Sequence, residues 1–372
     1  MKYAKKTVLL QENLLIMEKW RVFILGFAGI LCAASMWANI SFPTSAADSV
    51  IEKAIQDSII PGAVLCVVED GGISYLRAYG NRAIVPEVES MTTHTIFDLA
   101  SVSKPTGAGT AMLLLCAEGK VSVDDYVSQY IPNYHVDVQI RHLMTHYSGL
   151  PAYMGAARLD SIFHARGVKQ EQYPDWMIDT IAKCKRPTAV GEKYRYSCLN
   201  FISLQRVVEN IVGMDINTYL RDTHYKALGL PTMGWLPDDS LVYRIAPTEC
   251  TDSVCLRGLV HDPLAQMMMK GISGNAGVFA TAEEVAKWAI WMMNLDDETR
   301  IKGCHAGLWT DSVTTSTGLE TPSCRHTGYT GTSVTILPKE KRALVLLTNR
   351  VHPKDAHSLA TLRKALNTML TP

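Results

Sequence analysis

Residues 97–104 read FDLASVSK and lead into a long apolar stretch that ends at residue 118. The apolar spacing predicts a helix over residues 102–118, and Ser101 and Lys104, three positions apart, share one face at its start. An amine held against a serine hydroxyl and partly desolvated can act as a base for it. The N–H groups and the dipole at a helix N-terminus favour negative charge nearby. The stretch therefore predicts a nucleophilic serine with its base beside it.

The residues alone leave two other interpretations of this stretch open. A Ser-x-x-Lys spacing arises by chance in most proteins of this length, where it marks a helix cap followed by an exposed lysine. Ser103 is a second candidate nucleophile by residue type, but its position next to Lys104 puts the two side chains on different faces. The spacing favours Ser101.

Two further polar segments are candidates for the same site. Residues 194–200 read YRYSCLN and open a predicted helix, and a tyrosine such as Tyr196 at this junction can exchange protons when cations lie beside it. Residues 325–332 read RHTGYTGT before an apolar strand, and Arg325 or His326 could meet a carboxylate there. Taken alone, each segment is better explained as a packed aromatic or a solvated turn.

The apolar patterns predict one sheet built from both ends of the chain. They predict helices at residues 47–58, 102–118, 174–184, 200–212, 282–294 and 354–369, and strands at 63–68, 73–79, 333–337 and 343–348. A strand pair near each end, with helices between, indicates an antiparallel β-sheet flanked by helices. The segment at about 120–260 would be an inserted, mostly helical subdomain. This is an α/β fold of the α+β type.

The composition excludes several classes of protein. The chain has 372 residues with 47% hydrophobic and 19% charged side chains, which is ordinary globular composition. Residues 1–21 hold five of the 36 basic and two of the 36 acidic side chains, so the rest is slightly acidic. We therefore expect no nucleic-acid partner. We expect residues 1–47 to be a signal region and residues 48–372 to form a single domain.

The N-terminal region has the composition of an export signal. Residues 22–38 read VFILGFAGILCAASMWA without a charge, after the basic run 19–21. Met17 is an alternative translation start, and cleavage after Ser35 or after Ala47 fits the small-residue pattern. An uncleaved anchor is the competing interpretation, although the stretch is at the short limit for a spanning helix. We expect an exported protein of the periplasm or cell envelope.

The cysteines fit this compartment without requiring many bridges. Removing Cys32 of the signal from the nine cysteines leaves an even number, which permits disulfides in an exported chain. Cys250 with Cys255 and Cys304 with Cys324 are the candidate pairs. A chain of this length can bury a large core without such bridges, so we expect most of the cysteines to be free thiols.

The order of these motifs resembles that of the penicillin-recognising serine hydrolases: Ser-x-x-Lys, then Tyr-Ser, then a basic residue with Thr-Gly. Residues 143–151 read LMTHYSGLP, similar to the family's LLTHTSGLP, and residues 273–282 read SGNAGVFATA, similar to its GxAGLFSTA. The resemblance runs from about residue 51 to the C-terminus. It is strongest for the group of class C β-lactamases, D-alanyl-D-alanine carboxypeptidases, D-aminopeptidases and related esterases. It implies a β-lactamase/transpeptidase-like fold.

The resemblance also implies a role for each catalytic group. Ser101 would attack a carbonyl and become acylated. Lys104 and Tyr196 would shuttle its proton, with Tyr196 first as general base and then as acid toward the leaving group. The backbone N–H groups of Ser101 and Tyr329 would form the oxyanion hole.

On the substrate side, the resemblance implies that His326, Thr327 and Gly328 line the edge along which the acyl chain lies.

Two positions depart from the family pattern. Cys198 stands where Tyr-x-Asn has its asparagine, so Asn200 would have to turn inward to hold a substrate amide. His326 stands where class C β-lactamases carry lysine, and a largely neutral histidine attracts a carboxylate less strongly. Both changes argue against an efficient β-lactamase.

A metal hydrolase is a competing interpretation. His142 and His146 lie four positions apart, a spacing that binds zinc on some helices. The glutamate of His-Glu-x-x-His is absent and no third ligand follows at a suitable spacing. His146 lies in a segment explained by the resemblance, where we expect a structural role. We expect His261 and Asp262 to form a buried polar pair or a turn, and we expect no metal.

These points together predict an exported serine hydrolase that works through an acyl-enzyme on Ser101 without a metal or organic cofactor. The expected activity is that of a D-alanyl-D-alanine carboxypeptidase-like or penicillin-binding enzyme. Its partner would be a small peptide or ester, with a cell-wall stem peptide as the first choice and no membrane contact beyond the signal. A carboxylesterase or β-lactamase of the same fold is the alternative. A non-catalytic envelope receptor for peptidoglycan fragments is the alternative from another class.

Overall fold

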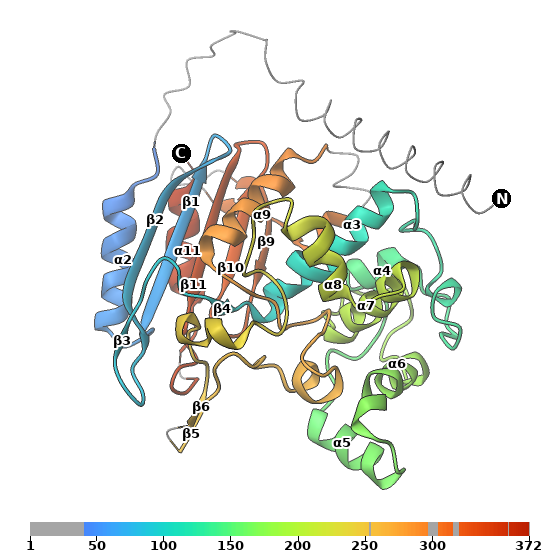
Figure 1. Cartoon of the computed structure of the whole chain (residues 1–372). Helices are drawn as coiled ribbons and strands as arrows, with labels where there is room; N and C mark the ends of the chain where they lie inside the picture. Colours follow the sequence, from blue (N-terminus) through green and yellow to red (C-terminus); the bar gives the residue numbers. More distant parts are fainter. Residues whose placement is uncertain (1–40, 253, 297–303, 315–319, 356, 372) are drawn as a thin grey trace, which may run out of the picture. The chain divides into compact units, whose positions relative to one another are not determined.

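The computed structural model describes residues 41–252, 254–296, 304–314, 320–355 and 357–371 (Figure 1). The expected export signal lies outside these residues. The chain is already folded at Phe42, which is buried, and the first described helix, α2 (Thr44–Gln56), begins ahead of the expected domain start at residue 48. None of the described helices is long and apolar enough to cross a bilayer.

The centre of the fold is one antiparallel sheet made from both ends of the chain. Its strand order is β3 (Glu89–Ser90), β2 (Gly72–Ala83), β1 (Gly62–Glu69), β11 (Arg342–Thr348), β10 (Ser333–Leu337), β9 (Glu320–Thr327) and β8 (Trp309–Thr314). The first hairpin meets the last strand at the middle, where Leu65 pairs with Leu346. The predicted sheet is confirmed. The pair β8–β9 was not predicted.

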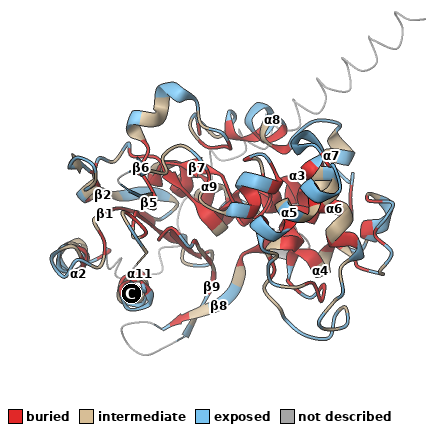
Figure 2. Cartoon of the chain, turned by 90° about the horizontal axis from the view of Figure 1, so that it is seen from below, coloured by how far each residue is buried: buried red, intermediate tan, exposed pale blue. Residues whose placement is uncertain are grey.

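Alternating side chains of the central strands supply two hydrophobic layers. Val64 and Cys66 of β1 face a core closed by α9 (Ala282–Asn294), whereas Leu65 faces a second core under α2 and α11 (Ala360–Leu370). Figure 1 shows α2 and α11 on one side of the sheet and α9 on the other. In Figure 2 the buried residues concentrate on the central strands of the sheet, α9 and α3. Burial on both faces explains why β1 reads as a continuous apolar run.

The middle of the chain forms the predicted helical part. After α3 (Thr110–Ala117), its helices are α4 (Ile140–Met144), α5 (Ala156–Ala165), α6 (Tyr173–Lys183), α7 (Cys198–Val212) and α8 (Ile216–Leu220). Two short strand pairs connect it with the sheet: β4 (Phe97–Asp98) with β7 (Phe279–Ala280), and β5 (Cys250–Thr251) with β6 (Val254–Cys255). Short 3₁₀ or π turns lie at Ala100–Val102, Lys104–Gly109, Val127–Gln129, Gln170–Gln172, Arg221–Tyr225, Asp239–Arg244, Leu264–Met268 and Cys304–Gly307.

Two predicted helices differ from the structure. The stretch after Ser101 is a 3₁₀ turn and then a π turn before α3 begins at Thr110, because Pro105 and two glycines disfavour a regular helix there. The C-terminal helix begins at Ala360 rather than at residue 354, since the described residues before it, 354–355 and 357–359, are not helical. By contrast, α9 has the predicted bounds, which a reciprocal Thr281–Glu284 capping box fixes at its start.

Candidate active site

Ser101 lies in the 3₁₀ turn Ala100–Val102, which follows the short strand β4. The buried Asp98 carboxylate fixes this turn by accepting the N–H of Ala100 (2.8 Å) and the N–H of His261 (2.7 Å). Ala100 has φ +47°, a left-handed conformation that costs a non-glycine residue energy. The fold therefore holds the residue before Ser101 in a strained turn through a buried carboxylate.

Lys104 is fully buried, and its Nζ points at three acceptors. It donates to Ser101 Oγ (3.0 Å), to the carbonyl of Asn275 (2.9 Å) and to Cys198 Sγ (3.6 Å). Burial alone would lower the pKa of Lys104, but electrostatic attraction to the adjacent Cys198 and Tyr196 outweighs it and raises that pKa above its usual value. The amine therefore carries its proton at neutral pH and holds the Ser101 hydroxyl as a charged donor.

Tyr196 lies just before α7, with its ring beside the amine and between two histidines. Lys104 Nζ is 5.0 Å from the ring centroid. The ring centroids of His146, Trp309 and His326 lie 4.6, 5.9 and 6.2 Å from that of Tyr196. The fold thus brings together the three side chains expected to be catalytic, although they come from separate parts of the chain.

A buried polar network supports Tyr196 from behind. The Ser197 N–H donates to His146 Nδ1 (3.1 Å), and Asn200 Nδ2 lies 2.9 Å from the same atom. Ser148 Oγ donates to Asn200 Oδ1 (2.5 Å). Burial, with Lys104 nearby, lowers the pKa of His146 to about 3, so this ring is neutral. Asn200 is fully buried with both ends of its amide bonded, and this position does not fit its expected contact with substrate.

His326 is a buried, neutral ring stacked on an aromatic neighbour. Its ring lies 4.5 Å from that of Trp309 at an interplanar angle of 16°. Its Nδ1 donates to the Thr327 carbonyl (3.0 Å), and burial together with the Lys104 charge holds its pKa well below the usual value. Within the described part of the chain, His326 Nε2 and Trp309 Nε1 are buried without a partner. Both atoms can therefore bond a ligand or a water.

The end of β9 is tied directly to the segment that carries Ser101, the expected nucleophile. Thr330 Oγ1 donates to the carbonyl of Asp98 (2.8 Å), and Thr332 Oγ1 donates to that of Leu99 (2.8 Å). A Cβ on Gly328 would lie 2.5 Å from the Leu99 carbonyl and 2.1 Å from Thr332 Oγ1. This close approach requires glycine and fixes the distance between the two halves of the expected oxyanion hole.

Tyr329 follows this glycine, and its ring forms a wall of the cleft. The ring stacks on His261 (5.5 Å, 22°) on one side, and the Arg350 guanidinium lies 5.0 Å from it on the other. Its hydroxyl donates to Asp355 (2.6 Å). No acceptor in the described residues takes the Tyr329 backbone N–H. That N–H is therefore available to a substrate oxygen.

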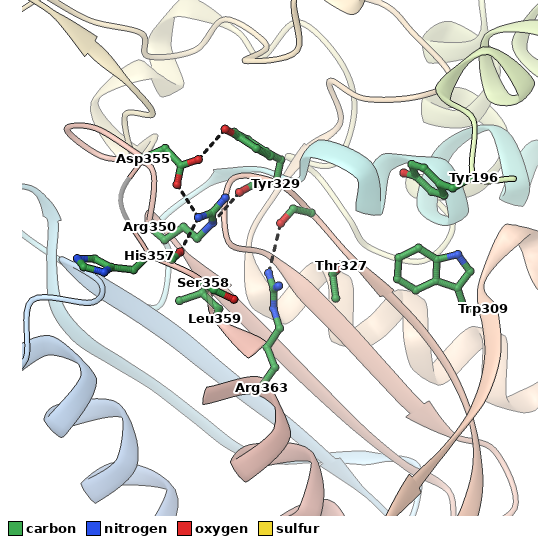
Figure 3. A pocket seen from close by; sticks show the side chains of 11 residues that line it. Tyr196, Trp309, Thr327, Tyr329, Arg350, Asp355, His357, Ser358, Leu359 and Arg363 are labelled. Atoms are coloured by element: carbon green, nitrogen blue, oxygen red, sulfur yellow. Dashed lines mark hydrogen bonds and ion pairs between the residues drawn. The ribbon is translucent and has the colours of Figure 1, made fainter. Parts of the chain in front are cut away.

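A cavity of about 700 Å³ opens beside these residues (Figure 3). It is lined by Tyr196, Trp309, Thr327, Gly328, Tyr329, Arg350, Asp355, His357, Ser358, Leu359 and Arg363. The expected Thr327–Gly328 edge and Tyr196 are in its wall, whereas Ser101 and Lys104 are not. The cavity can hold a drug-sized or dipeptide-sized group next to Tyr196.

A beta-lactamase family model matches residues 47–368, which is most of the chain. The chain belongs to the beta-lactamase family. It is a serine hydrolase of this family, which confirms the resemblance drawn from the motifs. The predicted β-lactamase/transpeptidase-like fold is confirmed as well.

Curated relatives and solved structures extend this assignment. A protein of Salmonella agona named "Putative D-alanyl-D-alanine carboxypeptidase" is 29% identical over 363 residues, covering 81% of each chain. The structure of EstCE1, a hydrolase with promiscuous acyltransferase activity, has a TM-score of 0.69 at 18% identity and covers 88% of this chain and 98% of its own. A class C beta-lactamase gives 0.68 at 19% identity, covering 90% and 97%. These structures show the shared fold.

Two other polar residues of the beta-lactamase motifs have roles outside catalysis. Ser103 is buried and its Oγ accepts the N–H of Val278 (2.9 Å), so it cannot approach a substrate. Arg325 forms an ion pair with Asp311 of the neighbouring strand β8, which occupies it away from the cleft. Spacing had already favoured Ser101 over Ser103, and the structure gives the physical reason.

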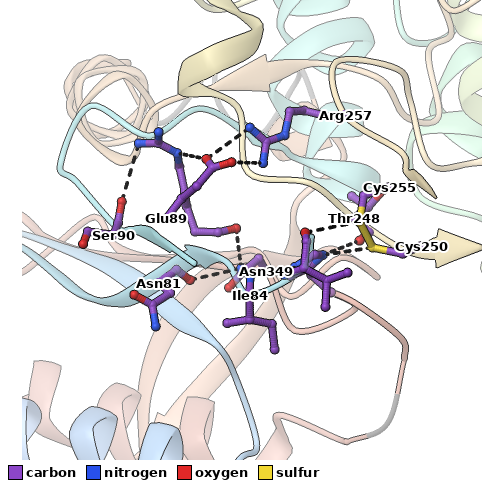
Figure 4. Close-up of polar contacts among 12 residues, drawn as sticks. Asn81, Ile84, Glu89, Ser90, Thr248, Cys250, Cys255, Arg257 and Asn349 are labelled. Carbon is purple, nitrogen blue, oxygen red and sulfur yellow. Dashed lines mark hydrogen bonds and ion pairs between the residues drawn. A yellow bond between two sulfur atoms is a disulfide. The ribbon is translucent and has the colours of Figure 1, made fainter. Parts of the chain in front are cut away.

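The possible metal ligands lie elsewhere in this beta-lactamase fold. Within the described residues, the group with ligand atoms close together is Cys250, Cys255 and His352, and it does not include the two histidines of residues 142–146. Cys250 and Cys255 form a disulfide (Figure 4), as one of the two candidate pairs predicted. His352 Nε2 accepts the N–H of Ile84 (3.0 Å), and its Nδ1 lies 3.1 Å from the carbonyl of Thr248. The two sulfur atoms are therefore bonded to each other and both ring nitrogens of His352 have partners, which leaves none of these atoms to bind a metal ion. The other predicted bridge involves a side chain outside the described residues.

Sequence reasoning missed three contributors to the site. Trp309 stacks on His326, the carbonyl of Asn275 holds Lys104, and Arg363 reaches the strand end from the last helix. The segment containing Asn275 was recognised as a family motif, which was a signal for its position but not for its role. Nothing in the sequence around Trp309 marks it as part of a site, because β8 is a polar edge strand.

Proposed function

We propose that this enzyme is a D-alanyl-D-alanine carboxypeptidase-like peptidase that forms an acyl-enzyme on Ser101. The observation that carries the proposal is the Lys104 Nζ to Ser101 Oγ contact of 3.0 Å, with Tyr196 beside the same amine. The relatives named "Putative D-alanyl-D-alanine carboxypeptidase" support the substrate class.

Because Lys104 is charged, Tyr196 is the group to which we assign the proton transfers. A protonated amine cannot accept the Ser101 proton, so it orients the hydroxyl, and Tyr196, acting as a phenolate paired with the Lys104 ammonium, takes the proton as Oγ attacks the substrate carbonyl. The C–N bond then breaks, Tyr196 returns the proton to the leaving amine, and D-alanine departs. Water attacks the ester by the reverse sequence and releases the shortened peptide. The Ser101 and Tyr329 N–H groups stabilise the tetrahedral oxyanion in both steps.

The test is release of D-alanine from diacetyl-L-lysyl-D-alanyl-D-alanine, together with the intact mass after exposure to benzylpenicillin. The wild type should release D-alanine and gain the mass of the penicillin, and Ser101→Ala should do neither. Ser103→Ala is the matched control and should retain both properties. Absence of D-alanine release by a folded wild type would refute the peptidase proposal.

Carboxylester hydrolysis is the second candidate, and Cys198 favours it. The thiol stands at the position where the family pattern has an amide, 3.6 Å from Lys104 Nζ. It offers a substrate amide one weak donor, so recognition of the acyl amide is weakened while an ester carbonyl loses nothing. Hydrolysis of p-nitrophenyl acetate that depends on Ser101, without D-alanine release, would select this function. Covalent labelling by benzylpenicillin without turnover of either substrate would favour the alternative of a non-catalytic receptor.

We also propose that the enzyme is exported to the cell envelope. The support is the uncharged stretch at residues 22–38 after a basic run. N-terminal sequencing of the protein recovered from the periplasm should find the first residue before Phe42, because Phe42 and Ala47 are buried in the core. Recovery of the full-length chain from the cytoplasm would contradict export.

A further inference from the structure

Arg363 connects the last helix with the strand end that carries the expected oxyanion hole. Its Nη2 donates to the carbonyls of Gly328 (3.3 Å) and Thr332 (3.0 Å). Figure 3 shows the side chain extending from α11 toward the segment that carries Thr327 and Tyr329. Both carbonyls belong to one tight turn, which the Gly328 N–H closes by donating to the Thr332 carbonyl (2.8 Å).

The Gly328 carbonyl and the Tyr329 N–H belong to the same peptide unit. In a planar trans peptide these two groups point in opposite directions, so a donor that holds the carbonyl also fixes the direction of the N–H. A cation on the carbonyl oxygen polarises the unit and makes its N–H a stronger donor. Arg350 Nε holds the next carbonyl, that of Tyr329, at 2.8 Å. The two peptide units that flank the Tyr329 Cα are therefore each held by an arginine.

Arg350 has a carboxylate partner, whereas Arg363 has none among the described residues. Arg350 forms an ion pair with Asp355 (2.6 Å), but no carboxylate of the described residues pairs with Arg363. Burial, with Arg350 nearby, lowers the pKa of Arg363 to about 10, so it stays charged at neutral pH. Its Nε is buried without a partner in the described part of the chain. A half-buried, unbalanced cation whose Nε is buried without a bond is costly, which argues that its charge serves a purpose.

We infer that Arg363 is a positioning residue for the oxyanion hole, where its unbalanced charge and its bond to Gly328 orient and strengthen the Tyr329 N–H donor. This inference rests on the proposed acyl-enzyme function. Negative charge develops on the carbonyl oxygen in the transition state, whereas the bound substrate carries little. Loss of Arg363 therefore lowers kcat and leaves KM nearly unchanged.

Three substitutions separate charge, hydrogen bonding and packing. Arg363→Lys keeps the cation, Arg363→Gln keeps a donor without charge, and Arg363→Met keeps neither. Lys364→Met removes an exposed cation from the next position of the same helix and is the matched control. Each variant is compared by its melting temperature, by kcat and KM for p-nitrophenyl acetate, and by the Ki of phenylboronic acid, which forms a tetrahedral adduct with a serine.

We expect Arg363→Met to lose about 10- to 100-fold in kcat, as supporting residues of catalytic groups do, with Arg363→Gln close behind. The Ki for phenylboronic acid should rise in proportion, Arg363→Lys should recover most of both, and Lys364→Met should match the wild type. A well-folded Arg363→Gln with wild-type kcat and Ki would overturn the inference. A wild type that neither hydrolyses the ester nor binds the boronic acid would instead refute the proposed function.

Discussion

Replacing Cys198 by asparagine would test what the thiol does in this cleft. The thiol is half-buried at the first position of α7, 3.6 Å from Lys104 Nζ. A carboxamide there can accept from Lys104 through its oxygen and donate to a substrate through its nitrogen. Cys198→Asn should therefore improve turnover of substrates that carry an amide carbonyl in the acyl part, and leave simple esters unaffected.

The magnitude follows from which of the two new bonds changes during the reaction. The bond from Lys104 forms in the free enzyme as well as in the transition state, so it does not alter kcat/KM. The bond to the substrate carbonyl forms on binding, and a net hydrogen bond contributes about 0.5–1.5 kcal/mol. The ratio of kcat/KM for an acylated D-alanyl peptide to that for p-nitrophenyl acetate should rise about 2- to 13-fold, as RT of about 0.59 kcal/mol converts this energy.

The assay measures both kcat/KM values on the wild type, Cys198→Asn and Cys198→Ala. The alanine variant is the control for loss of the thiol alone, and its ratio should stay at or below that of the wild type. An unchanged ratio in a well-folded Cys198→Asn, or an equal rise in Cys198→Ala, would show that this position does not read the substrate amide.

Three further outcomes are expected. Ser101→Ala should abolish labelling by a fluorophosphonate probe, whereas Ser103→Ala should label normally but melt at a lower temperature, because it loses a buried hydrogen bond. Burial puts the pKa of His146 at about 3 against 6.5 in the unfolded chain, so the unfolded state binds more protons between these two values. The free energy of unfolding should therefore fall as the pH drops through this window. Urea unfolding at pH 7 and at pH 5 measures this pH dependence, which His146→Gln should reduce. Gly328→Ala should lose roughly 100-fold in kcat, because its Cβ would meet the Leu99 carbonyl at 2.5 Å and displace the turn. Steady-state kinetics measure this loss, and a wild-type kcat would contradict the prediction.

The fold was predictable where one local pattern decides an element. The continuous apolar run of β1 and the capped, amphipathic α9 follow from neighbouring residues, and both lie where the sequence predicts. Strand β9 was missed because its residues, ETPSCRHT, are polar and contain a proline, and only pairing with β8 and β10 makes it a strand. The C-terminal helix was predicted too long because helical spacing continues back to residue 354, whereas Arg350 binds Asp355 and the carbonyl of His357 ahead of the helix.

The site divides in the same way. The three-residue spacing of Ser101 and Lys104 is local, so the sequence indicates their contact directly. Tyr196 could be added only through the resemblance, since nothing local connects it with Lys104. Trp309 and Arg363 could not be predicted at all, because they reach the site from an edge strand and from the last helix, and only the folded chain brings them there.

The position of the positive charges explains why histidine is suited to residue 326. This residue is fully buried, with the Lys104 ammonium close enough to lower its pKa, so a second cation here would be repelled by the first and poorly solvated. A neutral ring avoids that repulsion and still holds the strand end through its bond to the Thr327 carbonyl. The remaining cations of the cleft, Arg350 and Arg363, lie in the cavity wall behind the turn. The space beside Ser101 therefore keeps a single charged donor.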